Sequence, residues 1–150
     1  MAIERIPEWD LDAATDREIA ALVGRCFPTD FGGRSFFLTR HHLRLIDAAC
    51  LAEVATDPDC RGQGIASRLL RAAIAEAEAS PAEFMLLFGV ANLYAAAGFR
   101  AMTNPMVWID MLGAHTQEVR RDRFETLMVL PLRDSEWDGT ATLDPLGSLF

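Results

Sequence analysis

The sequence predicts an α/β or α+β domain built around a β-sheet. Runs of β-forming apolar residues alternate along the chain with segments whose apolar residues recur at helical spacing. One run, AEFMLLFGV at residues 82–90, is apolar almost throughout, which is typical of a strand buried on both faces. With 150 residues, 51% of them hydrophobic and 24% charged, the chain has the length and composition expected of one domain spanning residues 1–150.

The first elements expected are a short strand and a helix. Residues 3–7 have the composition of a strand that Pro7 would end. In residues 16–27 the apolar side chains fall on one helical face, and Thr15 or Asp16 is able to cap the start of this helix.

Two strands and a long helix are expected next. Residues 36–46 and 48–56 have the β-forming composition of strands, and Asp57-Pro58 ends the second. From Gly64 the apolar residues take up a helical period, which predicts an amphipathic helix that ends near Ser80-Pro81.

The remaining elements follow the buried run at residues 82–90. Residues 91–99 predict a short helix, because Gly98 stands where a glycine commonly ends one. Two further strands are expected at residues 101–112 and 124–132, with the polar stretch 113–123 as their connection. The tail, residues 133–150, shows little periodicity and is expected to lie over the surface.

A Gly-rich loop, Arg61-Gly62-Gln63-Gly64, joins the strand at residues 48–56 to the long helix. The first amides of a helix have no partners within the helix, and its dipole favours an anion there. Gly62 and Gly64 would let a phosphate approach these amides, and Arg61 adds a positive charge. The alternative is a tight turn in which the glycines serve the backbone alone, and the loop by itself leaves both readings open.

Two motifs extend this reading to a family. Arg61, Gly64 and Ala66 form R-x-x-G-x-A, and the stretch from Tyr94 to Phe99 forms Y-x-x-x-G-F. In this order the motifs resemble those of the GNAT superfamily of acyl-CoA-dependent N-acyltransferases, over roughly residues 14–132 as architecture. The resemblance implies a mixed, twisted sheet flanked by helices. It also implies transfer of an acetyl group from acetyl-CoA, as co-substrate, to an amine that attacks directly.

The resemblance also assigns roles to individual residues. Tyr94, the single tyrosine, would be the general acid at the CoA sulfur, and Glu53 would take the proton of the amine. The plainer alternatives are a half-buried aromatic ring and a strand Glu that is exposed or ion-paired. The remaining positions would bind the cofactor; they are Val54, Ala55, Thr56, Arg61, Gly62, Gln63, Gly64, Ile65, Ala66, Ser67 and Asn92.

The sequence departs from the family pattern in two places. Only residues 36–50 are available for the hairpin that precedes the acidic strand, so this early hairpin is shortened. The segment from Phe88 to Tyr94 is also short, so that the tyrosine helix lacks its usual first turn. These departures leave an alternative open: a CoA-binding module of the same fold that is catalytically weak or inactive.

Charge and composition restrict the partners. The balance of 14 basic against 22 acidic residues argues against nucleic acid, and no apolar run is long enough to span a membrane. The three cysteines and the acidic N-terminus suit the cytoplasm better than an exported protein. His41-His42 is not expected to bind a metal, because adjacent strand residues face opposite sides. The sequence leaves open whether the chain forms a homodimer.

The expected acceptor is a small amine, and the acidic chain favours a cationic one. A weak resemblance of the tail and of residues 26–33, CFPTDFGG, to aminoglycoside 2′-N-acetyltransferases points the same way. The alternative is that the acids only keep the surface soluble. The acids considered for the acceptor groove are Asp30, Asp47, Glu136, Asp138 and Asp144.

Overall fold

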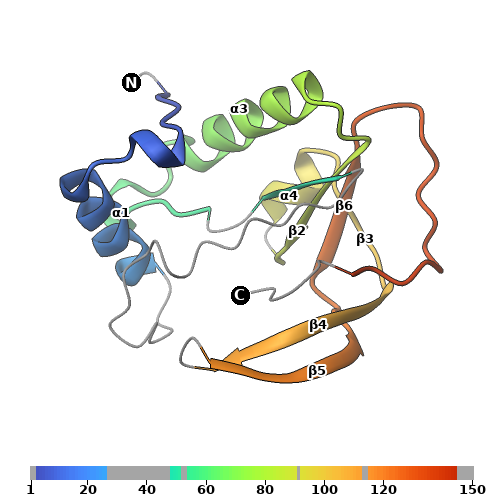
Figure 1. Cartoon of the computed structure of the whole chain (residues 1–150). Coiled ribbons are helices and arrows are strands. Elements are labelled where there is room, and N and C mark those ends of the chain that lie inside the picture. Colours follow the sequence, from blue (N-terminus) through green and yellow to red (C-terminus); the bar gives the residue numbers. More distant parts are fainter. Residues whose placement is uncertain (1–2, 27–47, 52–53, 91, 113–114, 145–150) are drawn as a thin grey trace.

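The computed structural model describes residues 3–26, 48–51, 54–90, 92–112 and 115–144 (Figure 1). At its centre lies a four-stranded sheet with the strand order β1-β2-β6-β3. β1 is parallel to β2, whereas β6 runs antiparallel to both of its neighbours, so the sheet is mixed as the family resemblance implied. The strands of this sheet are β1 (Ala48–Leu51), β2 (Phe84–Phe88), β6 (Leu127–Pro131) and β3 (Arg100–Ala101).

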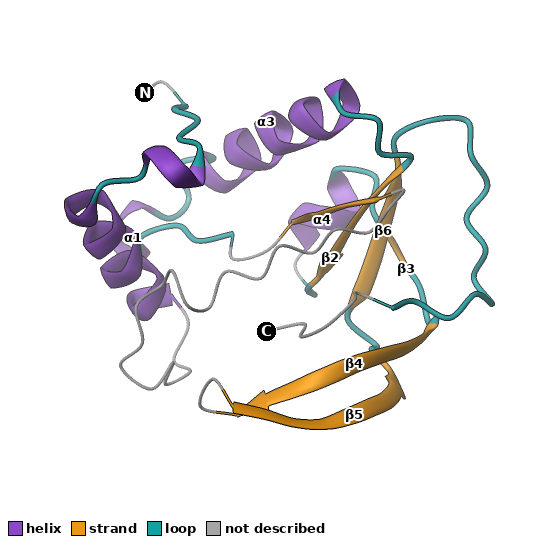
Figure 2. Ribbon diagram, viewed as in Figure 1, coloured by secondary structure: helices purple, strands orange, loops and turns teal. Residues whose placement is uncertain are grey.

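Among the described residues, three α-helices accompany the sheet: α1 (Ala13–Cys26), α3 (Ile65–Ala79) and α4 (Asn92–Ala96). Two short 3-10 helices, η1 (Glu8–Asp10) and η2 (Pro58–Cys60), precede α1 and α3. Figure 2 shows α3 running above the sheet, with α1 to one side of it. Within the described part of the chain, no helix combines the length and the apolar character needed to cross a membrane.

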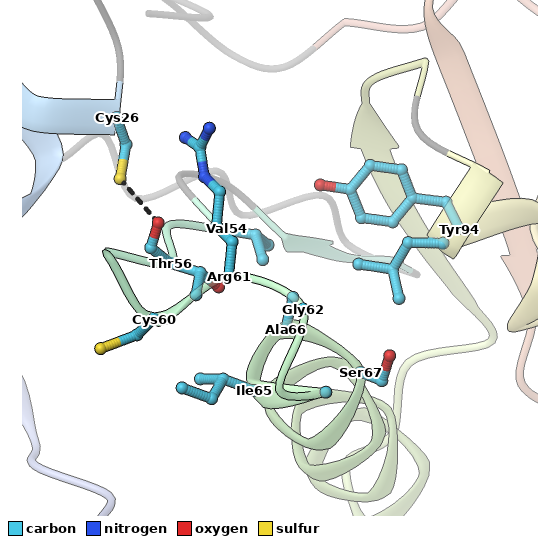
Figure 3. Close-up of a pocket in the computed structure, with 12 residues that line it drawn as sticks. Cys26, Val54, Thr56, Cys60, Arg61, Gly62, Ile65, Ala66, Ser67 and Tyr94 are labelled. Atoms are coloured by element: carbon cyan, nitrogen blue, oxygen red, sulfur yellow. Dashed lines mark hydrogen bonds between the residues drawn. The ribbon is translucent and has the colours of Figure 1, made fainter. Parts of the chain in front are cut away.

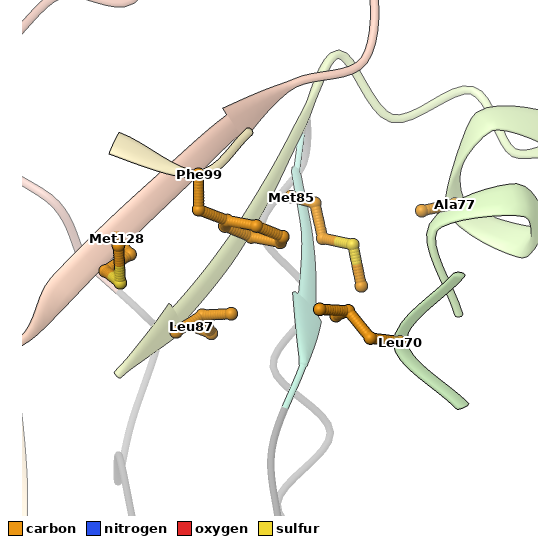
Figure 4. Packing of buried hydrophobic residues seen from close by; sticks show 6 residues of the cluster. All are labelled: Leu70, Ala77, Met85, Leu87, Phe99 and Met128. Atoms are coloured by element: carbon orange, nitrogen blue, oxygen red, sulfur yellow. The ribbon is translucent and has the colours of Figure 1, made fainter. Parts of the chain in front are cut away.

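The face of the sheet toward α3 and α4 forms one part of the core. Leu70 and Ala77 of α3 pack on Met85 and Leu87 of β2, and Phe99 and Met128 complete the cluster (Figure 4). Leu70 is 1% exposed, which places this leucine at the most enclosed part of the interface between helix and sheet. The apolar residues whose helical spacing predicted α3 therefore form the side of the helix that packs on the sheet.

The opposite face of the same strands forms the second part of the core. Phe84 and Leu86 of β2 alternate with the residues that face α3, and they pack with Leu127 and Val129 of β6. Because both faces are covered, β2 carries apolar residues without alternation, as residues 82–90 predicted. The helix expected from Gly64 to near Ser80 is also confirmed.

The N-terminal expectations are partly wrong. Residues 3–7 form no strand. The helix α1 begins at Ala13, earlier than expected, and neither Thr15 nor Asp16 caps it. Instead the Asp12 Oδ1 atom accepts hydrogen bonds from the backbone N–H groups of Ala14 (2.9 Å) and Thr15 (2.8 Å).

The strand expected at residues 48–56 is shorter in the structure. β1 ends at Leu51, and residues 54–57 belong to no strand. The strand expected at residues 36–46 lies outside the described residues. The shortened early hairpin lies outside them too, except for residues 48–50, which belong to β1. The chain between β1 and α3 is therefore largely a connection, and this connection builds the site described below.

The stretch at residues 113–123, expected as a polar connection, is largely a strand. β5 (His115–Arg123) pairs antiparallel with β4 (Pro105–Leu112) in a separate two-stranded sheet below the central one (Figure 1). The strand expected at residues 101–112 is correspondingly divided into β3 and β4. Cross-strand pairing thus organises polar residues that show no apolar pattern of their own.

The tail is packed more closely than expected. The centroid of the Trp137 ring lies 4.9 Å from the centroid of the Phe84 ring in an edge-to-face arrangement. Its Nε1–H donates to the Oδ1 atom of Asn104, which is fully buried, and the Asn104 amide donates to the carbonyl oxygens of Asp138 (2.8 Å) and Ala141 (2.9 Å). Asn104 therefore fastens residues 137–141 to the second face of the sheet.

Candidate active site

The connection between β1 and α3 supplies one wall of a cleft. Val54 and Thr56 lie half-buried in a stretch without regular secondary structure before η2, and Arg61 begins the turn that leads into α3. Gly62 and Gly64 have φ angles of +78° and +71°, a left-handed conformation that other residues adopt at a cost. A Cβ atom at either glycine would meet no protein atom within 4 Å, so both positions face open space.

The N-terminus of α3 is left without a capping side chain. Gly64 is its N-cap residue and offers no side-chain hydrogen bond, and no acidic residue lies in the first turn. The first-turn amides are therefore not satisfied by the groups that commonly cap a helix. With Arg61 beside them, they form a site of positive potential.

Arg25 of α1 holds the two acids that stand closest in sequence to this loop. Its Nη1 and Nη2 atoms lie 2.6 Å from Asp57 Oδ2 and 2.8 Å from Asp59 Oδ2. The hydrogen bond to Asp59, together with the negative charge of Asp57, raises the pKa of the guanidinium. Within the described residues no carboxylate forms an ion pair with Arg61. Arg61 is also exposed, so a ligand would have access to its positive charge.

Tyr94 of α4 supplies the facing wall. Its ring enters the cleft from the side opposite the loop, and its hydroxyl points toward the Val54 side (Figure 3). Partial burial raises the pKa of the phenol above its ordinary value of 10.0. The group therefore carries its proton at neutral pH and is able to donate it.

Thr56 presents two polar groups near the same cleft. Its carbonyl oxygen accepts a hydrogen bond from the Cys26 thiol at 3.2 Å, drawn dashed in Figure 3. Its hydroxyl oxygen is buried and has no hydrogen-bond partner within the described chain. A buried hydroxyl without a partner is costly, so a ligand that supplied one would be stabilised by this group.

Together these residues enclose a cleft of about 480 Å³. Most of the residues expected from the sequence lie around it, although α4 and the loop are distant in sequence. Its lining contains Val54, Thr56, Arg61, Gly62, Gly64, Ile65, Ala66, Ser67 and Tyr94 from the expected set.

Other expected residues are placed elsewhere. Ala55, Gln63 and Asn92 do not line the cleft, and Gln63 and Asn92 are exposed. Glu53, the expected base, lies outside the described residues. The roles assigned to all of these residues remain predictions.

Three lining residues were not expected: Cys26, Cys60 and Leu93. Cys26 reaches the cleft only because α1 ends beside Thr56, and no local pattern in the sequence indicates this contact. Leu93 precedes Tyr94 and Cys60 precedes Arg61, so proximity to the motifs was the available signal. In the described part of the chain, no group of three His, Cys, Asp or Glu side chains is placed to hold a metal ion.

None of the described acids considered for the acceptor groove lines this cleft. Glu136, Asp138 and Asp144 are tail residues that do not line it, whereas Asp30 and Asp47 lie outside the described residues. The carboxylate of Asp138 accepts from the hydroxyl and N–H of Thr140, and these hydrogen bonds lower its pKa. Asp138 therefore has a role in the turn of the tail.

Comparison with known proteins gives a family match, matches to solved structures and one negative result. The family model described as "Acetyltransferase (GNAT) domain" matches residues 16–101. The crystal structure of the ribosomal-protein-S18-alanine N-acetyltransferase from Escherichia coli is similar, with a TM-score of 0.59 and 20% sequence identity, over 84% of this chain and 93% of that one. At this identity the likeness concerns the fold. No curated protein matches the chain.

Proposed function

This chain belongs to the GNAT family of acetyltransferases, and we propose that it transfers an acetyl group from acetyl-CoA to a primary amine of a small, cationic acceptor. One observation carries the proposal: an uncapped helix N-terminus and a protonated tyrosine face each other across the same cleft. A pyrophosphate needs the first of these groups and a departing thiolate needs the second.

The lining of the cleft fits acetyl-CoA. Arg61 and the amides that follow Gly64 would hold the pyrophosphate, and the open space at Gly62 and Gly64 would admit it. Residues 54–56, which line or adjoin the cleft, would offer backbone groups to the pantetheine arm in the manner of an added strand. The unpartnered hydroxyl of Thr56 is a further donor or acceptor for the same molecule.

Acetyl-CoA supplies an activated thioester whose carbonyl carbon an amine attacks. In the chain, Tyr94 would give its proton to the departing sulfur, and the raised pKa keeps that proton in place until it is needed. Glu53 is proposed to take the proton of the amine. From a neutral amine, one proton leaves the acceptor nitrogen and one reaches the thiol of CoA. An acceptor that binds as an ammonium ion releases one further proton to solvent.

The proposal for the acceptor rests on charge. The chain has a formal net charge of −8, which attracts a cationic amine more than a neutral or anionic one. An aminoglycoside-like sugar, a polyamine and a basic peptide end are the classes considered. A peptide that begins with alanine belongs in the same panel, because the name of the structural neighbour states an alanine acceptor.

Two measurements test the proposal. A ligand that binds only the folded chain raises its melting temperature, so acetyl-CoA and CoA should both give a concentration-dependent increase. Release of the CoA thiol, followed with a thiol reagent across the amine panel, then reports transfer. Absence of any melting shift at saturating cofactor would contradict acetyl-CoA binding. A shift without thiol release would favour the CoA-binding module, to which the five-residue helix α4 gives some support.

The charge argument is tested with the best acceptor found. Its kcat/KM should fall as salt is added, whereas the kcat/KM of a neutral amine of similar size should change little. A best acceptor that is anionic, or a rate without salt dependence, would contradict the cationic assignment while leaving acetyl transfer intact.

Activity is expected from one cytoplasmic domain of residues 1–150, and sedimentation measurements would decide whether it forms a homodimer.

A further inference from the structure

The ring of Tyr94 lies against the backbone of Gly89, the residue that follows β2. A Cβ atom built on Gly89 would stand 2.7 Å from Cε2 and 3.3 Å from Cδ2 of the Tyr94 ring. Real Cβ atoms essentially never approach another heavy atom as closely as 2.7 Å, so the ring occupies the place of a side chain. Unlike Gly62 and Gly64, Gly89 does not have a positive φ angle. Glycine is therefore required at this position because it has no side chain, and not because of its backbone conformation.

The backbone of Gly89 is not free to retreat from the ring. Its N–H donates to the carbonyl oxygen of Thr126 at 2.8 Å, in the loop that precedes β6. The Leu87 Cδ1 atom also lies 3.4 Å from the position of the added Cβ. A side chain at position 89 would therefore act mainly on the ring.

Other neighbours also hold the ring of Tyr94 in place. It packs edge-to-face on the Phe99 ring with centroids 6.2 Å apart, and Phe99 is 3% exposed. The Tyr94 carbonyl oxygen accepts from the N–H groups of Ala97 (3.0 Å) and Phe99 (3.1 Å), which fix the end of α4. A ring pushed away from Gly89 would have to give up its place between this core and the cleft.

We infer that Gly89 is a positioning residue for Tyr94: by presenting bare backbone to the ring, it sets how far the tyrosine hydroxyl reaches into the cleft. The short connection between β2 and α4 explains the need, because it brings the ring directly onto the end of the strand. The inference rests on the proposed function in so far as it assigns this position a consequence for catalysis.

The test compares Gly89→Ala with Gly24→Ala. Both add one methyl group, but at Gly24 in α1 the added Cβ would meet nothing within 4 Å. Because the chain contains a single tyrosine, labelling with 3-fluorotyrosine gives one ¹⁹F resonance whose pH titration reports the phenol of Tyr94 alone. Relative to the labelled parental chain, Gly89→Ala should move this resonance and lower the pKa of the phenol, since a displaced ring loses burial. Gly24→Ala should leave both unchanged.

The kinetic expectation separates positioning from a general loss of structure. In Gly89→Ala, kcat should fall about tenfold or more while the KM for acetyl-CoA stays nearly constant, since small misplacements of a catalytic group are costly. In the Tyr94→Phe background the same methyl should cause little further loss of kcat, because the hydroxyl that it displaces is already absent. Equal losses in both backgrounds would contradict the inference.

A second comparison keeps the inference testable if Gly89→Ala does not fold. If Gly89→Ala unfolds the chain because of the ring, Tyr94→Ala in the same molecule should restore a cooperative melting transition. No restoration, or an unchanged ¹⁹F resonance in a folded Gly89→Ala variant, would overturn the positioning role. A changed resonance with unchanged kcat would leave the packing role in place and remove Tyr94 from the mechanism, so the two claims fail separately.

Discussion

The phenol of Tyr94 has a defined protonation behaviour that follows from its place in the cleft. Burial raises its pKa above 10.0, so the folded chain binds this proton more tightly than the unfolded chain does. Below pH 10 this contribution to stability is fully present, and it is lost as the pH rises through the folded pKa. A rate that depends on the protonated phenol should accordingly decline only in the alkaline range.

Tyr94→Phe tests this assignment most directly, because it removes the hydroxyl and keeps the ring. For a general acid we expect kcat to fall by roughly 10²–10⁴-fold, with the affinity for acetyl-CoA nearly unchanged. The alkaline limb of the kcat profile that belongs to the phenol should disappear as well. Steady-state kinetics from neutral to alkaline pH provide both readouts. Parental turnover in this variant would remove Tyr94 from the chemistry.

A substitution at a single residue, Gly64, tests the anion site. Asparagine tolerates a left-handed backbone better than most residues, so Gly64→Asn should keep the turn at φ +71° and add a side chain where no protein atom lies within 4 Å. The melting temperature should change little, whereas the affinity for CoA should fall strongly. Titration calorimetry with CoA measures this, and Gly139→Asn, also in open space but in the tail, is the matched control. Parental affinity in Gly64→Asn would indicate that the loop is only a turn.

At the scale of elements, Arg25 joins the end of α1 to the connection before α3. Its ion pairs with Asp57 and Asp59 hold two negative charges near the proposed pyrophosphate site. Arg25→Met should therefore release both carboxylates, weaken CoA binding by several-fold and make the loss smaller at high salt. Arg5→Met, which removes the exposed ion pair to Glu76 on α3, is the control and should leave CoA affinity unchanged. Equal behaviour of the two variants would contradict a role of Arg25 at the site.

How far the elements could be predicted depends on whether their signal is local. The stripe that begins at Ile65 and the apolar run of β2 are set by burial of nearby residues, and both were predicted closely. β5 was missed because its polar residues are ordered by pairing with β4, which leaves no apolar alternation. The Asp12 cap was missed because Thr15 and Asp16 are equally good capping residues by type.

The site shows the same division. The Gly-rich loop and Tyr94 stand in ordered motifs, which made them candidates from the amino-acid sequence alone. The structure places Arg61, Gly62, Gly64 and Tyr94 around one cleft, and their roles stay predictions. The approach of Cys26 to Thr56 and of the Tyr94 ring to Gly89 depends on how helices and strands are placed in space. A single sequence carries no local signal for such contacts.

At the scale of the whole molecule, the central sheet separates two kinds of packing. α3 and α4 cover one face, and they also carry residues of the cleft. Trp137 and Leu143 of the tail pack with the core on the other face, and Leu143 also pairs with Met106 of β4. The tail should therefore contribute to stability independently of cofactor binding. This expectation treats Trp137 as a packing anchor; the alternative is that Trp137 forms part of an acceptor pocket.

Trp137→Phe and Trp137→Ala test this division. Trp137→Phe retains an aromatic ring near Phe84 but leaves the Oδ1 atom of the fully buried Asn104 without its donor, which should lower the free energy of unfolding by about 1–3 kcal/mol. Trp137→Ala also removes the ring and should cost more. Denaturant unfolding measures both losses, while kcat and the KM values for acetyl-CoA and the amine should stay near parental in the folded fraction, because Trp137 does not line the cleft. A rise in the KM for the amine, with the KM for acetyl-CoA unchanged, would instead assign Trp137 to the acceptor pocket.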